Sequence, residues 1–437
     1  MSAGKNRKRS ALNKYLEGYS ECEAKVIDTL ISSVNECYDH VLVIPVYDES
    51  FDALSTLINN SFNDKNVLFI LVVNCPVNGD LEASKRTLQL WDQLLASTEP
   101  SCNVITNVDN VVYSKRSGGQ GLILVDRCSE SRQIPKKQGV GLARKIGADI
   151  GCALIAKGLI GSRWIHSTDA DVSLPSDYFC CTDEVIKNNI ALVYPFEHVP
   201  ENGYEIASEL YDLSLRYYVE SLHWAGSDYA FHTIGSLIAI DFEAYAKVRG
   251  FPKRAAGEDF YLLNKLAKVG DVFSLDEPII EIAARPSHRV PFGTGPALNK
   301  IVQKSDEPFV FYHPEIFKCL KQFITSLELA GVQVDEHEVK CSADIFPGLN
   351  SYILKALDSL DFCSAWRHAK AHSGSRPQFI KHITTWFDAF ITLKFIHFLR
   401  NNFYPSVELT VLTTQADYLS PERQAKISKL ITSINKC

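Results

Sequence analysis

Val41-Leu-Val-Ile-Pro-Val46 and Asn66-Val-Leu-Phe-Ile-Leu-Val-Val73 are short, continuous apolar runs rich in β-branched residues. Runs of this kind are typical of strands that are covered on both faces, as in a parallel sheet. Between them, Phe51, Leu54 and Ile58 recur at helical spacing. This part of the chain therefore predicts a strand–helix–strand unit.

The same alternation continues along the chain. A helical pattern begins at Gly139, a strand pattern covers Arg163–Thr168, and strands and helices then alternate as far as about Ala283. The alternation predicts an α/β fold with a mainly parallel sheet. The stretch between residues 97 and 138 predicts a β-hairpin or a mobile loop inserted into this sheet. Its glycines do not suit a phosphate-binding loop, which needs a strand just before it and a helix just after.

The character of the sequence changes after Pro296, where long helical patterns replace the strands. The segment Ile383–Leu399 is strongly apolar, but Asp388 and Lys394 interrupt it. It predicts either a packed helix or a peripheral contact with a membrane or a partner. We divide the chain into an N-terminal tail and helix (1–36), an α/β domain (37–298) and a C-terminal helical domain (299–437).

Composition narrows the class of protein. The 437 residues are 46% hydrophobic and 22% charged, with a formal charge of −7. These values exclude a largely disordered chain and give no basic excess for nucleic-acid binding. Twelve cysteines without a C-x-x-C pair indicate reduced thiols and a cytoplasmic protein. The sequence predicts no secretory signal and no transmembrane segment.

Two carboxylates follow the predicted strand Arg163–Thr168, as Asp169-Ala-Asp171. In extended backbone they would project to the same side and repel each other unless a cation lies between them. The carboxyl ends of strands in an open α/β sheet are common ligand sites. Mg²⁺ or Mn²⁺ would suit these oxygens and would attract phosphate groups. The alternative is a simple turn, where Asp is common.

Charged residues at two helix starts extend this candidate site. Glu258 and Asp259 precede an amphipathic helix. Such acids either cap the helix or supply a general base for an acceptor hydroxyl. Arg144 and Lys145 lie near the helix start at Gly139, where they either hold a diphosphate together with backbone N–H groups or form a solvated basic pair.

A loop with many hydrogen-bond donors follows the last predicted strand of the sheet. Arg285-Pro-Ser-His-Arg-Val-Pro-Phe-Gly-Thr-Gly295 contains His288 and Arg289 beside flexible glycines. The loop either closes over a ligand, bringing His288 to a metal and an arginine to phosphates, or is simply exposed.

Taken in order, these segments resemble the family-2-like glycosyltransferases of the GT-A fold, over about residues 40–295. Four motifs carry the resemblance. Ile44-Pro-Val-Tyr-Asp-Glu49 resembles the I-P-x-Y-N-E opening, Gly139–Lys145 the G-x-x-x-A-R-N helix start, Asp169-Ala-Asp171 the D-x-D, and Val248-Arg-Gly-Phe251 with Glu258-Asp259 the V-G-G-F…E-D motif.

The resemblance implies a Rossmann-like nucleotide-diphospho-sugar transferase fold. It also implies metal-dependent transfer of a sugar from a nucleotide-diphosphate sugar to a hydroxyl acceptor, with inversion as the expected outcome. Retaining GT-A enzymes share the D-x-D, so retention is the alternative. The resemblance implies that Asp259 is the catalytic base, with Glu258 beside it. It implies that the donor is bound by Pro45, Tyr47, Glu49, Asn74, Arg144, Lys145, Asp169 and Arg289. It implies that Mg²⁺ or Mn²⁺ is bound by Asp169, Asp171 and His288.

Departures from the family pattern keep other interpretations open. The second strand ends in Asn74-Cys-Pro-Val-Asn-Gly-Asp80 in place of an acidic D-D-x-S-x-D run, which leaves base recognition to Asn74 or Asp80. Asp169-Ala-Asp-Val-Ser173 also resembles the nucleophile motif of haloacid-dehalogenase-type phosphatases, with Asp169 attacking phosphorus and Asp171 as acid/base. A non-catalytic relative that only binds a nucleotide sugar is the third interpretation.

Overall fold

The computed structural model describes residues 10–31, 36–98, 105–183, 189–286, 293–304, 307–329 and 339–434. The chain forms two compact units. The first is built from Met1–Val199, Thr233–Ala283 and Arg289–Phe292, and the second from Pro200–His232, Ala284–His288 and Gly293–Cys437. No helix in the described ranges is long and apolar enough to cross a membrane.

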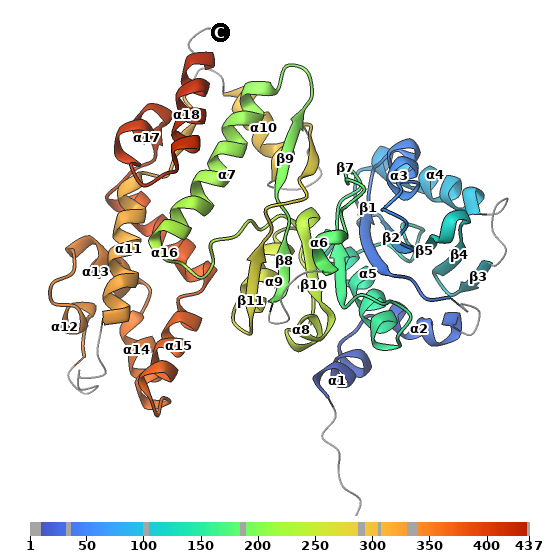
Figure 1. Cartoon of the computed structure of the whole chain (residues 1–437), viewed down its shortest axis with the longest axis horizontal. Helices are drawn as coiled ribbons and strands as arrows, with labels where there is room; N and C mark the ends of the chain where they lie inside the picture. The colour runs from blue at the N-terminus through green and yellow to red at the C-terminus, as the bar shows by residue number, and fades with distance from the viewer. Residues whose placement is uncertain are drawn as a thin grey trace, which may run out of the picture. The chain divides into compact units, whose positions relative to one another are not determined.

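The first unit contains a large sheet with helices on both faces (Figure 1). Its elements are α1 (Ala11–Gly18), α2 (Cys22–Ile31), β1 (His40–Val46), α3 (Phe51–Ile58), β2 (Val67–Asn74), α4 (Leu81–Thr98), β3 (Ile105–Val108), β4 (Val111–Lys115), the 3₁₀ helix η1 (Ser117–Gly119), β5 (Gly121–Arg127), α5 (Gly139–Ala156), β6 (Trp164–Ser167), β7 (Val172–Ser173), α6 (Cys180–Asp183), β8 (Asn189–Val193), β9 (Phe196–Pro200), the 3₁₀ helix η2 (Gly235–Leu237), β10 (Ile238–Asp241), α8 (Phe242–Lys247), α9 (Glu258–Leu266), β11 (Asp271–Ser274) and β12 (Ile280–Ala284).

The central sheet has nine strands in the order β11-β8-β10-β6-β1-β2-β5-β4-β3. β1 pairs in parallel with β2 and β6, and β2 pairs in parallel with β5. Only β4 and β10 run against the other seven of the nine strands, so the sheet is mainly parallel, as predicted. The hairpin predicted between residues 97 and 138 is β4–β5, and it belongs to the sheet itself. A small second sheet joins β7, β12 and β9.

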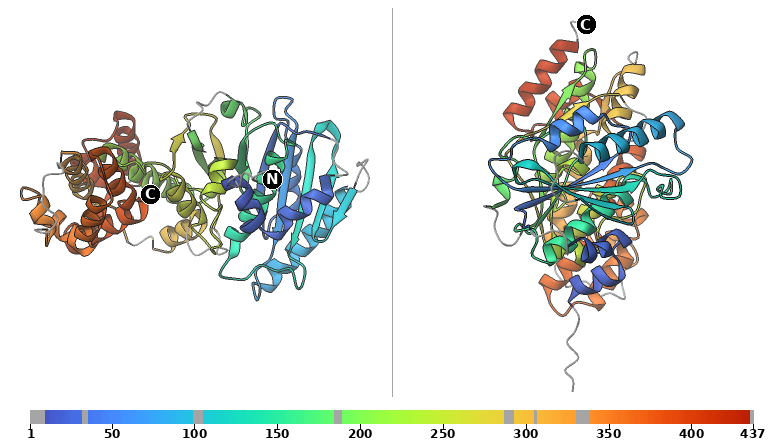
Figure 2. Two further views of the ribbon diagram at one scale, coloured as in Figure 1. Left: turned by 90° about the horizontal axis from the view of Figure 1, so that it is seen from below. Right: turned by 90° about the vertical axis from the view of Figure 1, so that its right-hand side faces the viewer.

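Helices cover both faces of the sheet. α5 packs on β1 and β2, and α4 packs on β2 from the other side. Figure 2 shows α3 and α4 on one face, with α2 and α5 on the opposite face. Every residue of β1 and β2 is consequently buried, which explains their continuous apolar sequences. Gly147 lets α5 approach closely, because a Cβ there would lie 2.3 Å from Cγ1 of Val43.

Helix α1 was not expected, because its sequence reads as part of a polar tail. Its buried residue is Tyr15. The Tyr15 hydroxyl donates to Asp149 Oδ1 at 2.5 Å and accepts from Lys145 Nζ at 2.6 Å. Tyr15 therefore anchors α1 through these polar contacts with α5 and through an edge-to-face contact with Tyr245 of α8. A hydrophobicity pattern does not reveal the polar contacts.

The second unit is helical, as predicted for the C-terminal part of the chain. Its elements are α7 (Glu205–Ala225), α10 (Thr294–Gln303), β13 (Val310–Phe311), α11 (Pro314–Leu329), α12 (Ser342–Ile345), α13 (Ser351–Ser359), α14 (Phe362–Ala371), α15 (Arg376–Trp386), α16 (Ala389–Asn402), β14 (Val407–Glu408), α17 (Leu409–Gln415) and α18 (Pro421–Ile434).

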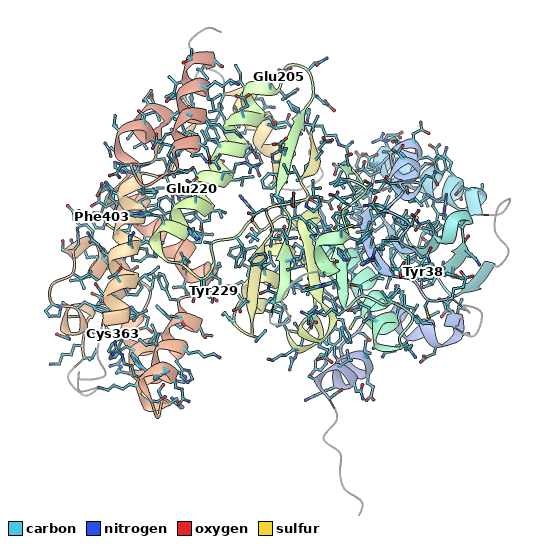
Figure 3. All side chains as sticks on the ribbon, in the orientation of Figure 1. Tyr38, Glu205, Glu220, Tyr229, Cys363 and Phe403 are labelled. Carbon is cyan, nitrogen blue, oxygen red and sulfur yellow. The ribbon has the colours of Figure 1, made fainter. Side chains whose placement is uncertain are left out.

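Helix α7 belongs to this helical unit, although the predicted boundary at residue 298 puts it in the preceding domain. Its side chains Leu213 and Tyr217 are buried in the same core as Phe317 on α11. Glu220 of α7, labelled in Figure 3, accepts from Arg423 at 3.0 Å on α18. A helix distant in sequence thus completes the core of the second unit.

The apolar segment Ile383–Leu399 forms two helices rather than one. Asp388 separates α15 from α16 and caps α16 by accepting from the backbone N–H of Ile391. Ile383, Phe395 and Leu399 are fully buried in the core of the unit. These side chains are therefore used for packing within the unit.

Candidate functional site

The carboxyl ends of four parallel strands meet at one edge of the central sheet. From β1 the chain proceeds outward to β2 and β5, and then returns to β6 on the other side of β1. Strand order therefore reverses next to β1, and such a switch point is the usual ligand site of an open α/β sheet. The four strands end at Val46, Asn74, Arg127 and Ser167.

Arg144, in the first turns of α5, joins the parts of this edge near β6. Its side chain is only 4% exposed. The guanidinium donates to Glu258 Oε1 at 2.8 Å and to Asp169 Oδ1 at 2.5 Å. It also donates to Ser167 Oγ at 2.9 Å and to the carbonyl of Thr168 at 3.3 Å. A solvated basic pair, one of the alternatives for Arg144 and Lys145, is therefore wrong for Arg144.

The guanidinium keeps its charge in this buried position. Burial by itself would lower the pKa of Arg144, but the carboxylates of Asp169, Glu258 and Asp259 outweigh it, and the pKa lies above its ordinary value. Two carboxylates thus contact one cation, and a third, Asp259, lies near enough to raise its pKa. The excess of negative charge would attract protons or a further cation.

Asp169 and Asp171 lie in a turn, not in a strand. β6 ends at Ser167 and β7 begins at Val172, and residues 170–171 are turn residues. The predicted strand through Thr168 is too long, and strand alternation does not place the two carboxylates. Arg144 fixes Asp169, whose side chain is 36% exposed. The backbone carbonyl of Asp171 accepts from Ala283 N at 3.2 Å.

Glu258 and Asp259 form the first turn of α9, as the sequence analysis expected. Glu258 is buried against Arg144. Asp259 Oδ1 accepts from the N–H of Phe260 at 2.7 Å. Burial and the adjacent carboxylate of Glu258 raise the pKa of Asp259 to about 7, against the lowering effects of the Phe260 N–H and Arg144. A carboxylate with this pKa is suited to take up a proton near neutral pH.

The glycines at the start of α5 serve a different purpose from the predicted one. A Cβ on Gly139 would lie 2.7 Å from Cα of Ala255, and one on Gly141 would lie 2.5 Å from the carbonyl oxygen of Pro252. Gly141 N donates to the carbonyl of Arg254 at 3.0 Å. The segment ahead of α9 thus covers the helix start and uses one of its N–H groups, so the prediction that this helix start is open to a diphosphate is wrong.

Lys145 points away from Arg144 and its carboxylates. Its Nζ lies 3.0 Å from Asp149 Oδ2 and 2.6 Å from the Tyr15 hydroxyl, under α1. Both side chains of the ion pair are at most 5% exposed. The structure therefore gives Lys145 a buried role in holding α1, and we do not include it among the donor-binding residues.

Three of the predicted donor-binding residues lie at the end of β1 and in the loop that follows it. Pro45 is buried near the end of β1, beyond Val43, where the pairing with β6 stops. Its missing N–H therefore costs no hydrogen bond to β6. Tyr47 and Glu49 follow, each partly exposed. Burial and the nearby Cys75 raise the pKa of Tyr47.

Helix α4 holds this loop in place. Arg86 forms two hydrogen bonds with the carboxylate of Asp48, at 2.7 and 3.0 Å, and Thr87 Oγ1 accepts from Asp48 N at 3.0 Å. Asp80, the other candidate for base recognition, caps α4 by accepting from Ala83 N at 2.7 Å. This capping makes Asn74 the better candidate.

Asn74 and Arg127 end neighbouring strands and are register partners, so their side chains point to the same face of the sheet. Asn74 is 6% exposed. Its Oδ1 and the Nε of Arg127 are buried without a hydrogen-bond partner among the described residues. Arg127 also pairs with the buried carboxylate of Glu23, through Nη2 at 2.6 Å. The two atoms without a partner, an acceptor and a donor on neighbouring strand ends, point to a polar ligand or a bound water. Arg127 was not among the predicted site residues, although it ends a strand next to that of Asn74.

Oxygen ligands for a divalent cation are present, but in small number. In the described part of the chain, no group of three or more His, Cys, Asp or Glu side chains gathers to hold a metal ion. Mg²⁺ often uses only one or two protein carboxylates and takes its other ligands from phosphates and water. Asp169 and Asp171 fit that chemistry. His288 and Arg289, the remaining predicted ligands, lie outside the described residues.

Comparison with known proteins does not assign a family. No family model and no curated protein sequence matches this chain. A solved structure, S. aureus TarS 1–349 in complex with UDP-GlcNAc, is similar with a TM-score of 0.37 and 11% sequence identity, covering 79% of this chain and 89% of that chain. A likeness at this level establishes neither a fold nor a function.

Proposed function

We propose that the first unit is a GT-A-type glycosyltransferase that moves a sugar, with inversion, from a nucleotide-diphosphate sugar to a hydroxyl acceptor. One observation carries this proposal. A single buried arginine, Arg144, links Asp169 after β6 to Glu258 beside Asp259, at the edge of the sheet where the strand order reverses. A donor-side carboxylate and a candidate base thus belong to one charged cluster.

On the donor side, Tyr47, Glu49 and Asn74 would bind the nucleoside at the ends of β1 and β2. The open Oδ1 of Asn74 and the open Nε of Arg127 suit a base that presents a donor next to an acceptor. A Mg²⁺ or Mn²⁺ ion held by Asp169 and Asp171, when bound, would offset the charge that develops on the departing diphosphate.

On the acceptor side, Asp259 would take the proton from the attacking hydroxyl while that oxygen bonds to the sugar and the bond to the diphosphate breaks. A pKa of about 7 keeps a sizeable fraction of Asp259 ionised at neutral pH and makes it a stronger base than an ordinary carboxylate. Glu258 stays paired with Arg144 and so holds the start of α9 in place.

The decisive experiment is a thermal-shift panel of nucleotide sugars with and without Mn²⁺, followed by an assay for diphosphate release with the donor that stabilises most. A ligand that binds the native state raises the melting temperature by mass action. Asp171→Ala should remove the metal-dependent part of the shift. Asp259→Asn should keep the shift and remove turnover. Full transfer by Asp259→Asn would refute the role of Asp259 as the base.

Two other results would favour the alternative functions. Stabilisation by a nucleotide sugar without any diphosphate release, across a range of acceptors, would indicate a non-catalytic binding protein. A phosphoryl analogue trapped on Asp169 would indicate a phosphatase. A cytoplasmic location and a peripheral partner for the helical unit stay predictions, and fractionation of tagged full-length protein would test both.

A further inference from the structure

We infer that Arg144 is a positioning residue that sets the distance between the donor-side carboxylate and the start of α9, and that Gly235 provides the space for it. This inference rests on the proposed function and assigns Arg144 a different task from the phosphate binding that its position in the sequence suggests. Arg144 makes several directed contacts in a buried position.

Arg144 has almost no hydrogen-bonding capacity left for a ligand. A guanidinium has five N–H groups. Four hydrogen bonds, to Glu258, Ser167, Thr168 and Asp169, occupy four of these groups. With the side chain 4% exposed, a diphosphate could reach one N–H at most.

The contacts of Arg144 join segments that are far apart in the sequence. Arg144 lies 25 residues before Asp169 and 114 residues before Glu258. The planar guanidinium holds its donors in a fixed fork, so it sets the directions of both carboxylates together. A shift of the turn after β6 would therefore move the first turn of α9, and with it Asp259.

Gly235, at the start of η2, makes room for the guanidinium. A Cβ at that position would lie 2.5 Å from Nη2 of Arg144 and 2.8 Å from its Cζ. The backbone of η2 thus lies directly against the guanidinium, and Ser236 beside it accepts from Thr168 Oγ1 at 3.1 Å through its carbonyl. A methyl group at position 235 would push the guanidinium away from its acceptors.

These contacts suggest two variants that disturb the link from opposite sides. Arg144→Lys keeps the charge but replaces the fork with a single ammonium, which cannot reach both carboxylates in the same geometry. Gly235→Ala leaves Arg144 in the sequence but displaces its head group. Arg163→Lys is the control, since Arg163 directly precedes β6, at the end away from Ser167, and pairs with Asp241.

The first measurement is backbone hydrogen exchange by mass spectrometry, with each variant held at an equal interval below its own melting temperature. Exchange in both segments, 168–173 and 257–261, should become about tenfold faster in Arg144→Lys and in Gly235→Ala. The control should match the wild type. Faster exchange in only one segment, or in neither, would overturn the linking role.

The second measurement is steady-state kinetics with the donor identified above. Misplacement of a catalytic group by about 1 Å costs about 100-fold in rate. We therefore expect kcat to fall about 100-fold in both variants, with donor KM changed by less than about threefold. The double variant should be no worse than the poorer single one, because both changes act through one guanidinium.

The opposite kinetic pattern would overturn the inference. If Arg144 bound the diphosphate, Arg144→Lys would raise donor KM about tenfold or more, and Gly235→Ala would not follow it. If the wild-type protein transfers no sugar to any acceptor, the proposed function fails. Hydrogen exchange then still decides whether Arg144 links the two segments. Should Arg144→Lys fail to fold, Gly235→Ala supplies the same test.

Discussion

Replacing Lys145 with methionine should destabilise the protein by about 3 kcal/mol, because removing one partner of a buried ion pair costs about 3–5 kcal/mol. The Lys145 ammonium contacts Asp149 and Tyr15 and is almost fully buried. Asp149 would keep its hydrogen bonds from the hydroxyls of Tyr15 and Tyr245 and from the N–H of Glu21. These remaining donors place the loss at the lower end of the range.

The loss should also depend on pH. Burial raises the pKa of Asp149, and Lys145 opposes that rise, so the Lys145→Met variant raises the pKa further. A carboxyl whose pKa is higher in the folded state than in the unfolded state favours folding at low pH, and that advantage disappears as pH rises through the folded-state pKa. The variant should therefore be most destabilised near neutral and alkaline pH and should recover part of its stability in acid.

Urea unfolding of the variant at about pH 8 and about pH 5 tests this reasoning. Lys85→Met is the control, since both members of the Lys85–Glu82 pair are exposed and such pairs contribute less than about 1 kcal/mol. Lys145→Met combined with Asp149→Asn, which removes both charges, should be more stable than Lys145→Met alone. A loss below about 1 kcal/mol in Lys145→Met, together with loss of nucleotide-induced stabilisation, would refute the structural role of Lys145.

Three further outcomes are expected. Burial, reinforced by His40, depresses the pKa of His166 well below its ordinary value. This residue therefore contributes stability above about pH 6.5 that is lost as pH falls, by up to about 1.4 kcal/mol per pH unit. The urea midpoint of the His166→Phe variant should vary less with pH than that of the wild type. Gly141→Ala should lower the melting temperature, since its Cβ would lie 2.5 Å from a backbone oxygen of Pro252; an unchanged midpoint would contradict this packing. With a base of pKa about 7 at Asp259, kcat/KM for transfer should fall about tenfold per pH unit below that value, and a profile flat to about pH 5 would exclude this base.

Local patterns were sufficient for most of the sheet. β1, β2 and α3 lie where the apolar runs and the helical spacing predict them, because strands buried on both faces have continuously apolar sequences. The position of Glu258 and Asp259 at a helix start was likewise predictable from the amphipathic pattern that follows them. The extent of β6 was not, because the chain leaves the sheet after Ser167 to place Asp169 beside Arg144.

The neighbours Arg144 and Lys145 show what the sequence by itself determined about this protein and what required the tertiary structure. Sequence placed both charges in the first turns of one helix and placed Asp169 at the end of a strand. Adjacent residues on an α-helix point about 100° apart, so Arg144 meets Asp169 and Glu258, whereas Lys145 meets Asp149 under α1. Segments up to 130 residues away in the chain supply these partners, and only folding determines which of two identical charges lies in the site and which lies beneath a helix.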